Sequence, residues 1–236
     1  MDLERVGVML NKYHGPIKQN LDYIESLVKD GAKVLEIGPG KIPFSKATDF
    51  CGWTMEEKGR LNNYKIADAS TEMLPYQNKE FDFIYCRHVI EDLWNPVHAL
   101  KEISRIAKEG YIETPSALCE MTKDVDGGEK YVPYRGYNHH RYIIWNDNGV
   151  LNILPKFPIV EHINFKEEEK LEKLLEDPFN WCTFYHFKDE VKFKLLNMGR
   201  EQDFTMFDGT YLKLIIKGID KSLECSNKWK GLVNVE

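Results

Sequence analysis

The chain of 236 residues has no apolar run that approaches the roughly 20 residues needed to cross a bilayer. Its N-terminus also lacks the basic-then-apolar order of a secretory signal. The composition, 42% hydrophobic and 30% charged, is typical of globular proteins in water. We therefore expect a cytoplasmic protein without a membrane partner. One main domain is expected, since single cores grow to about 250 residues before they split.

The sequence has few cysteines and no excess of positive charge. The five cysteines form no C-x-x-C pair, which argues against a disulfide framework and against a zinc site. We expect them to be free thiols. The formal net charge of -6 gives no overall attraction for a polyanion, so a nucleic-acid partner is disfavoured.

The first part of the chain predicts a helix, a strand and a tight loop. Apolar residues recur at helical spacing from Ile17 to Val28, and Asp30-Gly31 supplies a stop. The next segment, 33–37, is too short for a helix, is rich in strand formers, and breaks at Gly38-Pro39-Gly40. It therefore predicts a buried strand that ends in a glycine loop.

Strands and helices continue to alternate along the chain. A second helix is predicted to start at Asn95-Pro96, with asparagine as the cap, and to end before Gly110. A charged helix is predicted at about 167–176, and the predicted strands are 47–53, 64–67, 81–86, 111–115, 183–187 and 211–216. The pattern predicts an α/β fold: a Rossmann-like, doubly wound, mostly parallel sheet flanked by helices, with a C-terminal antiparallel extension.

The glycine loop lies where doubly wound sheets bind their ligands, at the carboxyl end of a strand. Gly38 and Gly40 would let backbone approach a ligand closely. A dinucleotide site would have a third glycine at position 43, which is Pro43, and we recognise no Tyr-x-x-x-Lys pair. A nicotinamide-dependent oxidoreductase is therefore the less favoured interpretation.

Three segments in order, VLEIGPG, ADASTEMLPYQNKEFDFIYCRHVIEDLWNP and GYIETPS, resemble the motif set of class I S-adenosylmethionine-dependent methyltransferases. The resemblance covers about residues 16–116, and 117–236 would be a substrate-side insertion and C-terminal strands of the same single domain. It implies S-adenosylmethionine as the cofactor. It also implies methyl transfer to an O or N atom of a small-molecule or glycan-precursor acceptor. A non-catalytic scaffold that keeps the cofactor fold is the alternative.

The resemblance also assigns residues to the cofactor. Glu36 would accept hydrogen bonds from the cofactor's ammonium group, or would instead cap nearby backbone. Asp68, with Ala69 beside it, would meet the adenine, or would simply form a turn. Cys86 and Arg87 would line the cleft near the sulfonium, although burial as a small apolar residue also explains Cys86. The remaining implied cofactor positions are Gly38, Pro39 and Gly40.

The sequence departs from the family pattern at two places. Only 41–46 separate the first two strands, whereas a parallel crossover normally needs about a dozen residues, so the usual helix there must shrink to a turn. Ile42 also stands where many members have a third glycine. The acidic ribose contact is consequently hard to place. Glu57, or its neighbour Glu56, lies at the usual distance, but Trp53 or Thr54 can occupy the structural position.

Proton removal from a hydroxyl acceptor would need a base within hydrogen-bond reach. The candidates are His88, Asp92, His139 and His140. In the related fold the segment 134–142 lies over the active site, which also makes Arg141 a candidate for substrate contact. The same His-His-Arg cluster could instead be a hydrogen-bonded loop anchor. We expect no metal, because the third ligand that a metal site requires has only a distant candidate, His162.

Overall fold

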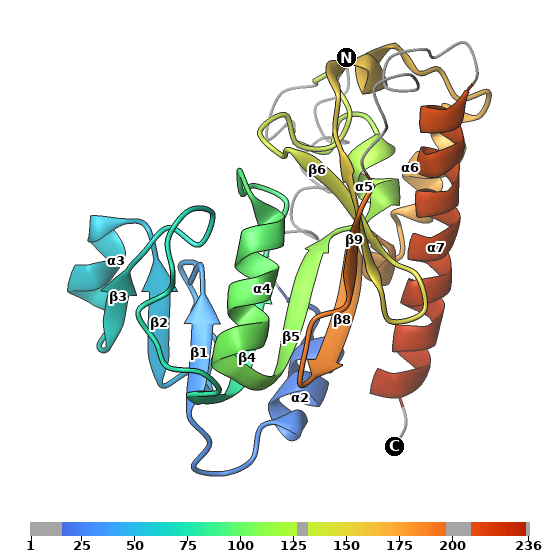
Figure 1. The fold of residues 1–236 in the computed structure, drawn as a ribbon. Helices are drawn as coiled ribbons and strands as arrows, with labels where there is room; N and C mark the ends of the chain where they lie inside the picture. Colours follow the sequence, from blue (N-terminus) through green and yellow to red (C-terminus); the bar gives the residue numbers. More distant parts are fainter. Residues whose placement is uncertain (1–15, 127–131, 197–208, 235–236) are drawn as a thin grey trace.

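The computed structural model describes residues 16–126, 132–196 and 209–234, apart from the side chains of Glu56 and Glu57. Its main feature is a six-stranded sheet with the strand order β3-β2-β1-β4-β5-β8 (Figure 1). Five strands are parallel, and β8 pairs antiparallel with β5. The strands are β1 (Val34–Ile37), β2 (Asp49–Gly52), β3 (Tyr64–Ile66), β4 (Phe81–Arg87), β5 (Ala107–Pro115) and β8 (Cys182–Lys188). The predicted α/β fold with an antiparallel extension is confirmed.

Helices cover both faces of this sheet, and strand residues alternate between them. Val34 and Phe83 pack on the face covered by α2 (Lys18–Leu27) and α7 (Thr210–Val233). Their neighbours Leu35 and Ile84 pack on the opposite face, under α4 (Pro96–Ile106). Burial on both faces explains why β1 reads as a continuous apolar run broken only by Glu36.

A second sheet, of order β6-β7-β9, lies beside α7 and was not predicted from the sequence (Figure 1). Trp145 of β6 packs against Gly218 of α7, where a Cβ atom would come within 3.0 Å of the indole. A glycine therefore brings helix and sheet close together. The second sheet and the short elements are β6 (Tyr142–Asn146), β7 (Leu151–Pro155), β9 (Phe193–Leu195), α3 (Met55–Arg60), α5 (Ala117–Met121), α6 (Glu168–Leu174), η1 (Pro158–His162) and η2 (Pro178–Trp181).

The strand predicted at 211–216 is wrong, because this segment begins the 24-residue helix α7. Tyr211 and Ile215 are buried, and the pattern continues at helical spacing through Ile219 to Trp229. Six residues were too few to show this period. No helix in the described ranges has the length and apolarity of a membrane span.

Gly110 does not end a helix, as the sequence predicted, but lies inside β5. The helix α4 ends at Ile106, and β5 follows without a loop. At Gly110 a Cβ atom would lie 2.8 Å from the Ile84 carbonyl oxygen and 2.7 Å from the Phe187 ring. Close packing against Ile84 and Phe187, and not the end of a helix, therefore explains why residue 110 is a glycine. The predicted start of α4 is confirmed, since the Asn95 side chain accepts a hydrogen bond from the His98 N–H.

Candidate active site

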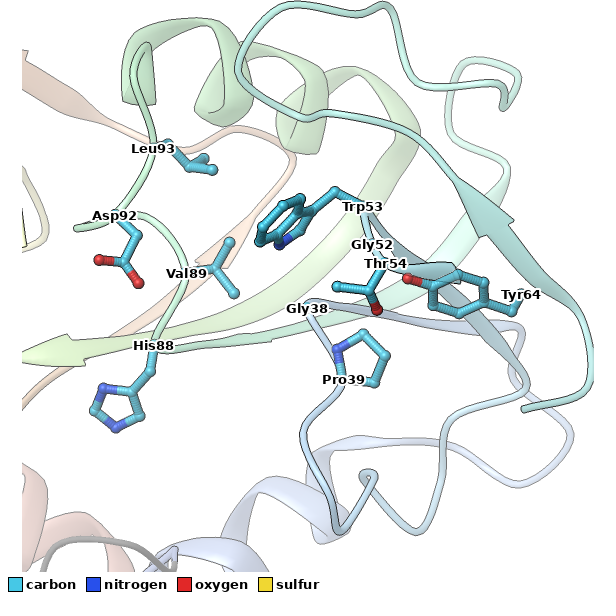
Figure 2. A pocket seen from close by; sticks show the side chains of 10 residues that line it. All are labelled: Gly38, Pro39, Gly52, Trp53, Thr54, Tyr64, His88, Val89, Asp92 and Leu93. Atoms are coloured by element: carbon cyan, nitrogen blue, oxygen red, sulfur yellow. The ribbon is translucent and has the colours of Figure 1, made fainter. Parts of the chain in front are cut away.

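A cleft of about 230 Å³ opens where β1, β2 and β4 end (Figure 2). This is the edge at which parallel α/β sheets bind ligands. Figure 2 shows the Trp53 ring pointing toward Val89, with Gly38 and Pro39 below them in this view. The residues that line the cleft are Gly38, Pro39, Gly52, Trp53, Thr54, Tyr64, His88, Val89, Asp92 and Leu93.

Gly38 forms the bend at the floor of the cleft. Its φ of +69° lies in the left-handed region, and a Cβ atom there would come within 2.3 Å of Val89 Cγ2. Its N–H donates to the Cys51 carbonyl, which ties the loop to β2. Gly40 differs, since a Cβ atom would meet nothing within 4 Å. The predicted glycine loop therefore requires glycine at Gly38 for conformational and steric reasons.

Glu36 is buried and holds the loop that leaves β1. Its Oε2 accepts a hydrogen bond of 2.8 Å from the Phe44 N–H, and the Phe44 ring stacks on Tyr85. This contact is the backbone capping that the sequence left open as an alternative role. A hydrogen bond from a cofactor ammonium would add to it. The passage from β1 to β2 contains no helix, in agreement with the short crossover predicted.

The wall at the end of β2 carries aromatic and hydroxyl groups. Trp53 is 80% exposed and lies beside Thr54 just after the strand. The Tyr64 hydroxyl is buried in the described structure without a hydrogen-bond partner, and a Cβ atom on Gly52 would lie 2.5 Å from it. Sequence reasoning missed Tyr64, which was assigned only to a strand. The side chain of Glu57, the predicted ribose contact, lies outside the described part of the chain.

Asp68 and Ala69 follow β3 as predicted, with Ala67 between the last strand residue, Ile66, and Asp68. The Asp68 carboxylate accepts from the Ser70 N–H at 2.7 Å and from the Thr71 hydroxyl at 3.0 Å. These contacts fix the turn that presents the buried Ala69. Asp68 thus forms the turn that was its alternative role, and its carboxylate is held in place by that turn.

Arg87 points to the neighbouring strand rather than into the cleft lining. Its Nε donates to Glu113 Oε1 at 2.7 Å, and Glu113 also accepts from the Tyr111 hydroxyl and from Asn20. Burial opposes the charge on Glu113, but Arg87 and His88 outweigh it and lower the pKa of the carboxyl well below its usual range. Burial raises the pKa of the fully buried Cys86 thiol, so Cys86 is a packing residue in this structure.

His88 lines the cleft between two carboxylates. Its Nδ1 lies 3.3 Å from Glu91 Oε1, and its Nε2 lies 3.3 Å from Glu113 Oε1. Burial lowers the pKa of this imidazole, but hydrogen bonds to Glu113 and Glu91 outweigh burial and raise the pKa overall. His88 is thereby stabilised as the charged form, in which it is an acid rather than a base.

The other three candidate bases come together at one edge of the cleft. Asp92 lines the cleft, and the Nε2 atoms of His139 and His140 each lie 3.9 Å from its Oδ1. His140 Nδ1 lies 2.6 Å from Glu120 Oε1, and Lys156 pairs with the other oxygen of Glu120 at 2.6 Å. Sequence reasoning grouped the histidines with Asp92 as candidates but missed Glu120 and Lys156, which no local motif marks.

Two arginines anchor the loop that carries the histidines. Arg135 is completely buried, donates to the Met121 carbonyl at 2.5 Å and pairs with Glu168. Arg141 donates to the Asp92 carbonyl at 2.5 Å, and its guanidinium lies 4.1 Å from the centre of the Trp94 ring. Of the two roles left open for the His-His-Arg cluster, Arg141 has that of a loop anchor. The imidazoles of His139 and His140 face Asp92.

Residues 46–112 match the family model described as a methyltransferase domain. The match spans β2 to β5 and therefore includes the strand ends that form most of the cleft. This part of the chain is therefore similar to a methyltransferase domain, and the strand order of the main sheet agrees with that similarity. The resemblance seen in the sequence is confirmed. No curated protein matches the chain.

Parts of several solved structures are similar to part of this chain at low sequence identity. A methyltransferase from Thermotoga maritima that depends on S-adenosylmethionine is 20% identical, with a TM-score of 0.38 over 49% of this chain and 57% of that one. The YcgJ protein from Bacillus subtilis is 18% identical, with a TM-score of 0.33 over 42% and 52%. Coclaurine N-methyltransferase, solved with N-methylheliamine and S-adenosylhomocysteine, is 22% identical, with a TM-score of 0.32 over 42% and 35%. The chain spans about half the length of the first structures it matches, 51% and 52%.

Proposed function

We propose that the chain binds S-adenosylmethionine in the cleft at Gly38 and transfers its methyl group to an O or N atom of a small-molecule or glycan-precursor acceptor. The observation that carries the proposal is the glycine bend at Gly38, which opens a cleft at the carboxyl ends of β1, β2 and β4, next to residues that match a methyltransferase domain. Residues 1–236 would form one methyltransferase domain, since α7 and β8 complete the same core as β1 and β4.

For the cofactor itself we propose the loop Gly38-Pro39-Gly40 as the floor of the site. Glu36 would hold that loop and face the ammonium end, while Asp68 and Ala69 would meet the adenine at the end of β3. Cys86 and Arg87 would support the wall behind His88, since Cys86 is buried and Arg87 pairs with Glu113. Glu57 keeps its proposed place beside the ribose.

The buried Tyr64 hydroxyl supports a further ribose contact. A buried hydroxyl without a partner is unfavourable, and a hydrogen bond to a ribose hydroxyl would remove that penalty. The hydroxyl lies against Gly52, at the end of β2, where class I methyltransferases hold the ribose by the resemblance. Tyr64 would thus act together with Glu57 or in its place.

Methyl transfer from a sulfonium is an in-line displacement that removes the cofactor's positive charge, so the protein must mainly align the reacting groups and exclude water. A hydroxyl acceptor would also lose its proton. We propose that this proton passes to Asp92 or to the histidine pair His139 and His140 beside it. His88 is a weaker candidate, because its two carboxylate neighbours favour its protonated form.

Calorimetric titration with S-adenosylhomocysteine tests the cofactor site directly. We expect binding with one site per chain, and loss of binding on replacement of Gly38. NAD serves as the competing ligand: binding of NAD in place of S-adenosylhomocysteine would favour the oxidoreductase alternative. Failure to bind either ligand would favour the non-catalytic scaffold. The acceptor can then be sought by mass spectrometry, as a gain of one methyl group in candidate hydroxyl or amine compounds.

A further inference from the structure

The side chains of Asp92, His139 and His140 form a cluster at the edge of the cleft, which we call the Asp92 cluster. Its three ligand atoms all lie within 4.8 Å of one another, and both Nε2 atoms are 3.9 Å from Asp92 Oδ1. The carboxylate follows β4, and the histidines precede β6. Two imidazoles and one carboxylate are a donor set that divalent first-row transition ions prefer.

The ring of His140 is already held in the orientation that a metal ligand would need. Its Nδ1 lies 2.6 Å from Glu120 Oε1, and Glu120 is fully buried and paired with Lys156. The carboxylate at Nδ1 holds the ring so that Nε2, the nitrogen that would bind a metal, faces Asp92. The same carboxylate–histidine arrangement orients histidines that bind metals in other proteins.

Asp92 supplies an independent observation. In the described structure its Oδ1 is buried and accepts no hydrogen bond. An unpartnered buried carboxylate oxygen is unfavourable, and a cation would satisfy it. The nearby Arg141 donates to the main-chain carbonyl of Asp92 and not to this side-chain oxygen.

The spacing of the ligand atoms fits a site that closes on its ion. Metal–ligand bonds of about 2.1 Å put the ligand atoms of a tetrahedral site about 3.4 Å apart. The two nitrogen–oxygen distances of 3.9 Å are wider, and His139, whose side chain is 57% exposed, can move to shorten its own. The two loops are joined by the hydrogen bond from the Arg141 N–H to the Glu91 carbonyl, which fixes the other two ligands relative to each other.

A second cluster, formed by His88, Glu113 and Cys182, lacks these properties. Glu113 already accepts hydrogen bonds on both oxygens from Arg87, Tyr111 and Asn20. Burial raises the pKa of the Cys182 thiol well above its usual value, which disfavours the thiolate that a metal would bind. The comparison singles out the Asp92 cluster.

We propose that Asp92, His139 and His140 bind a divalent first-row transition ion, such as Zn²⁺, at the acceptor edge of the cleft. Asp92 lines the cleft, so the open coordination positions would face an acceptor. With an ion bound, the three ligands could no longer serve as the base proposed above. The ion would instead lower the pKa of a bound acceptor hydroxyl, which would release its proton to solvent. A metal site at the Asp92 cluster differs from the expectation from sequence that no metal binds. Asp92 would be the third ligand, for which His162 was the distant candidate.

The test is a titration of the metal-free chain with Zn²⁺ by calorimetry and with Co²⁺ by visible absorption. We expect one ion per chain and d–d bands of a nitrogen- and oxygen-ligated ion. His139→Ala and Asp92→Asn should each weaken Zn²⁺ binding at least about tenfold. Glu120→Gln should weaken it by about 10- to 100-fold, since it acts through His140. The matched control is His186→Ala, which removes a histidine also paired with a carboxylate, Glu109, at 2.7 Å.

Three results would overturn the proposal: no binding of Zn²⁺ or Co²⁺, unchanged binding in both His139→Ala and Asp92→Asn, or a thiolate-to-Co²⁺ charge-transfer band that places the ion at Cys182. His139 is exposed, so its replacement leaves the fold intact, and thermal unfolding checks this for each variant. Because ion binding is measured without cofactor, its failure is distinguishable from failure of the S-adenosylhomocysteine titration.

Discussion

At the scale of single residues, the cleft depends on groups whose role is invisible in the sequence motif alone. The two glycines of the loop look equivalent as letters, but Gly38 has a left-handed backbone against Val89 whereas Gly40 faces open space. Tyr64 is aromatic and in a strand, as a core residue would be, but its hydroxyl has no partner within the described structure. Both differences can be tested by small substitutions.

Gly38→Ala is expected to destabilise the fold by about 2 kcal/mol or more, because the left-handed conformation alone costs about 1–2 kcal/mol for a residue with a Cβ. The clash with Val89 adds to this penalty. S-adenosylhomocysteine binding should fall with it. Urea unfolding and calorimetry provide the measurements, and Gly40→Ala is the matched control, expected within about 0.5 kcal/mol of the unmodified chain. If Val89→Ala combined with Gly38→Ala restored full stability, steric contact rather than backbone strain would be the whole cause.

Tyr64→Phe is expected to weaken S-adenosylhomocysteine binding about 3- to 10-fold, the value of one hydrogen bond of about 0.5–1.5 kcal/mol. Stability without ligand should stay unchanged or rise slightly, since the substitution removes an unpartnered buried hydroxyl. Tyr185→Phe is the control, because the Tyr185 hydroxyl accepts from the Lys192 N–H, and that residue is not in the cleft lining. Equal affinity of Tyr64→Phe and the unmodified chain would rule out the ribose contact.

At the scale of helices and strands, β4 and β5 are joined by charge as well as by backbone hydrogen bonds. Arg87 and Glu113 are register partners, and Arg87 Nε donates to Glu113 Oε1 at 2.7 Å. Because both side chains are mostly buried, each depends on the other for compensation of its charge. The pair therefore fixes the carboxyl ends of two central strands beside the cleft.

Glu113→Gln is expected to cost about 3–5 kcal/mol at neutral pH, because it leaves Arg87 buried without its counter-charge. The pKa of Glu113 is lowered from an ordinary value of 4.5, so its contribution is present above pH 4.5 and is lost as pH falls through the folded-state pKa. The stability difference between the two chains should therefore shrink on acidification. Urea unfolding over a pH series measures it, and a difference that stays constant would exclude this linkage.

Element boundaries show how far the sequence could predict this fold. The alternation of strands and helices predicted the parallel sheet, and the Asn95-Pro96 cap predicted where α4 begins. Gly110 was wrongly interpreted as a helix end, because the reason for glycine at this position is close packing against Phe187, a residue far away in the sequence. The segment 211–216 was wrongly predicted as a strand, because a helical period becomes visible only over more than six residues.

The candidate site, like the fold, could be predicted from the sequence only in part. Local order predicted the loop at Gly38 and the placement of Asp68 after β3. Sequence could also name Asp92 and the two histidines, but not that their nitrogens face one carboxylate, because that meeting depends on the packing of two distant loops. The buried partners Glu120 and Lys156 come from α5 and from the residue after β7, and no motif connects them.

At the scale of the whole molecule, α7 closes one face of the main sheet. Trp229 stacks on Phe184 of β8, meets Tyr23 of α2 edge-on, and donates through Nε1 to Asn20 at 2.6 Å. Figure 1 shows this helix running along the side of the molecule next to β8 and the second sheet. The contacts connect elements from both ends of the described chain.

Trp229→Ala is expected to destabilise the fold by about 3–5 kcal/mol, since it removes a large buried ring and leaves Asn20 without that donor. Leu232→Ala, on the same helix but half exposed, should change stability by less than about 0.5 kcal/mol. Denaturant unfolding of the two variants compares them directly. A similar loss in both would indicate that the helix as a whole, rather than the Trp229 contact, is being disturbed.

The position of α7 also bears on how the protein is made. The hydrogen bond between Trp229 and Asn20 joins residues 209 positions apart, so it cannot form before Trp229 has left the ribosome. Until then, Val34, Phe83 and Tyr111 lack the helix that covers them, and a nascent chain exposes an apolar sheet face. At about 5–20 residues per second, synthesis lasts long enough for that face to attract other chains or a chaperone. This domain therefore completes its folding only after Trp229 has left the ribosome.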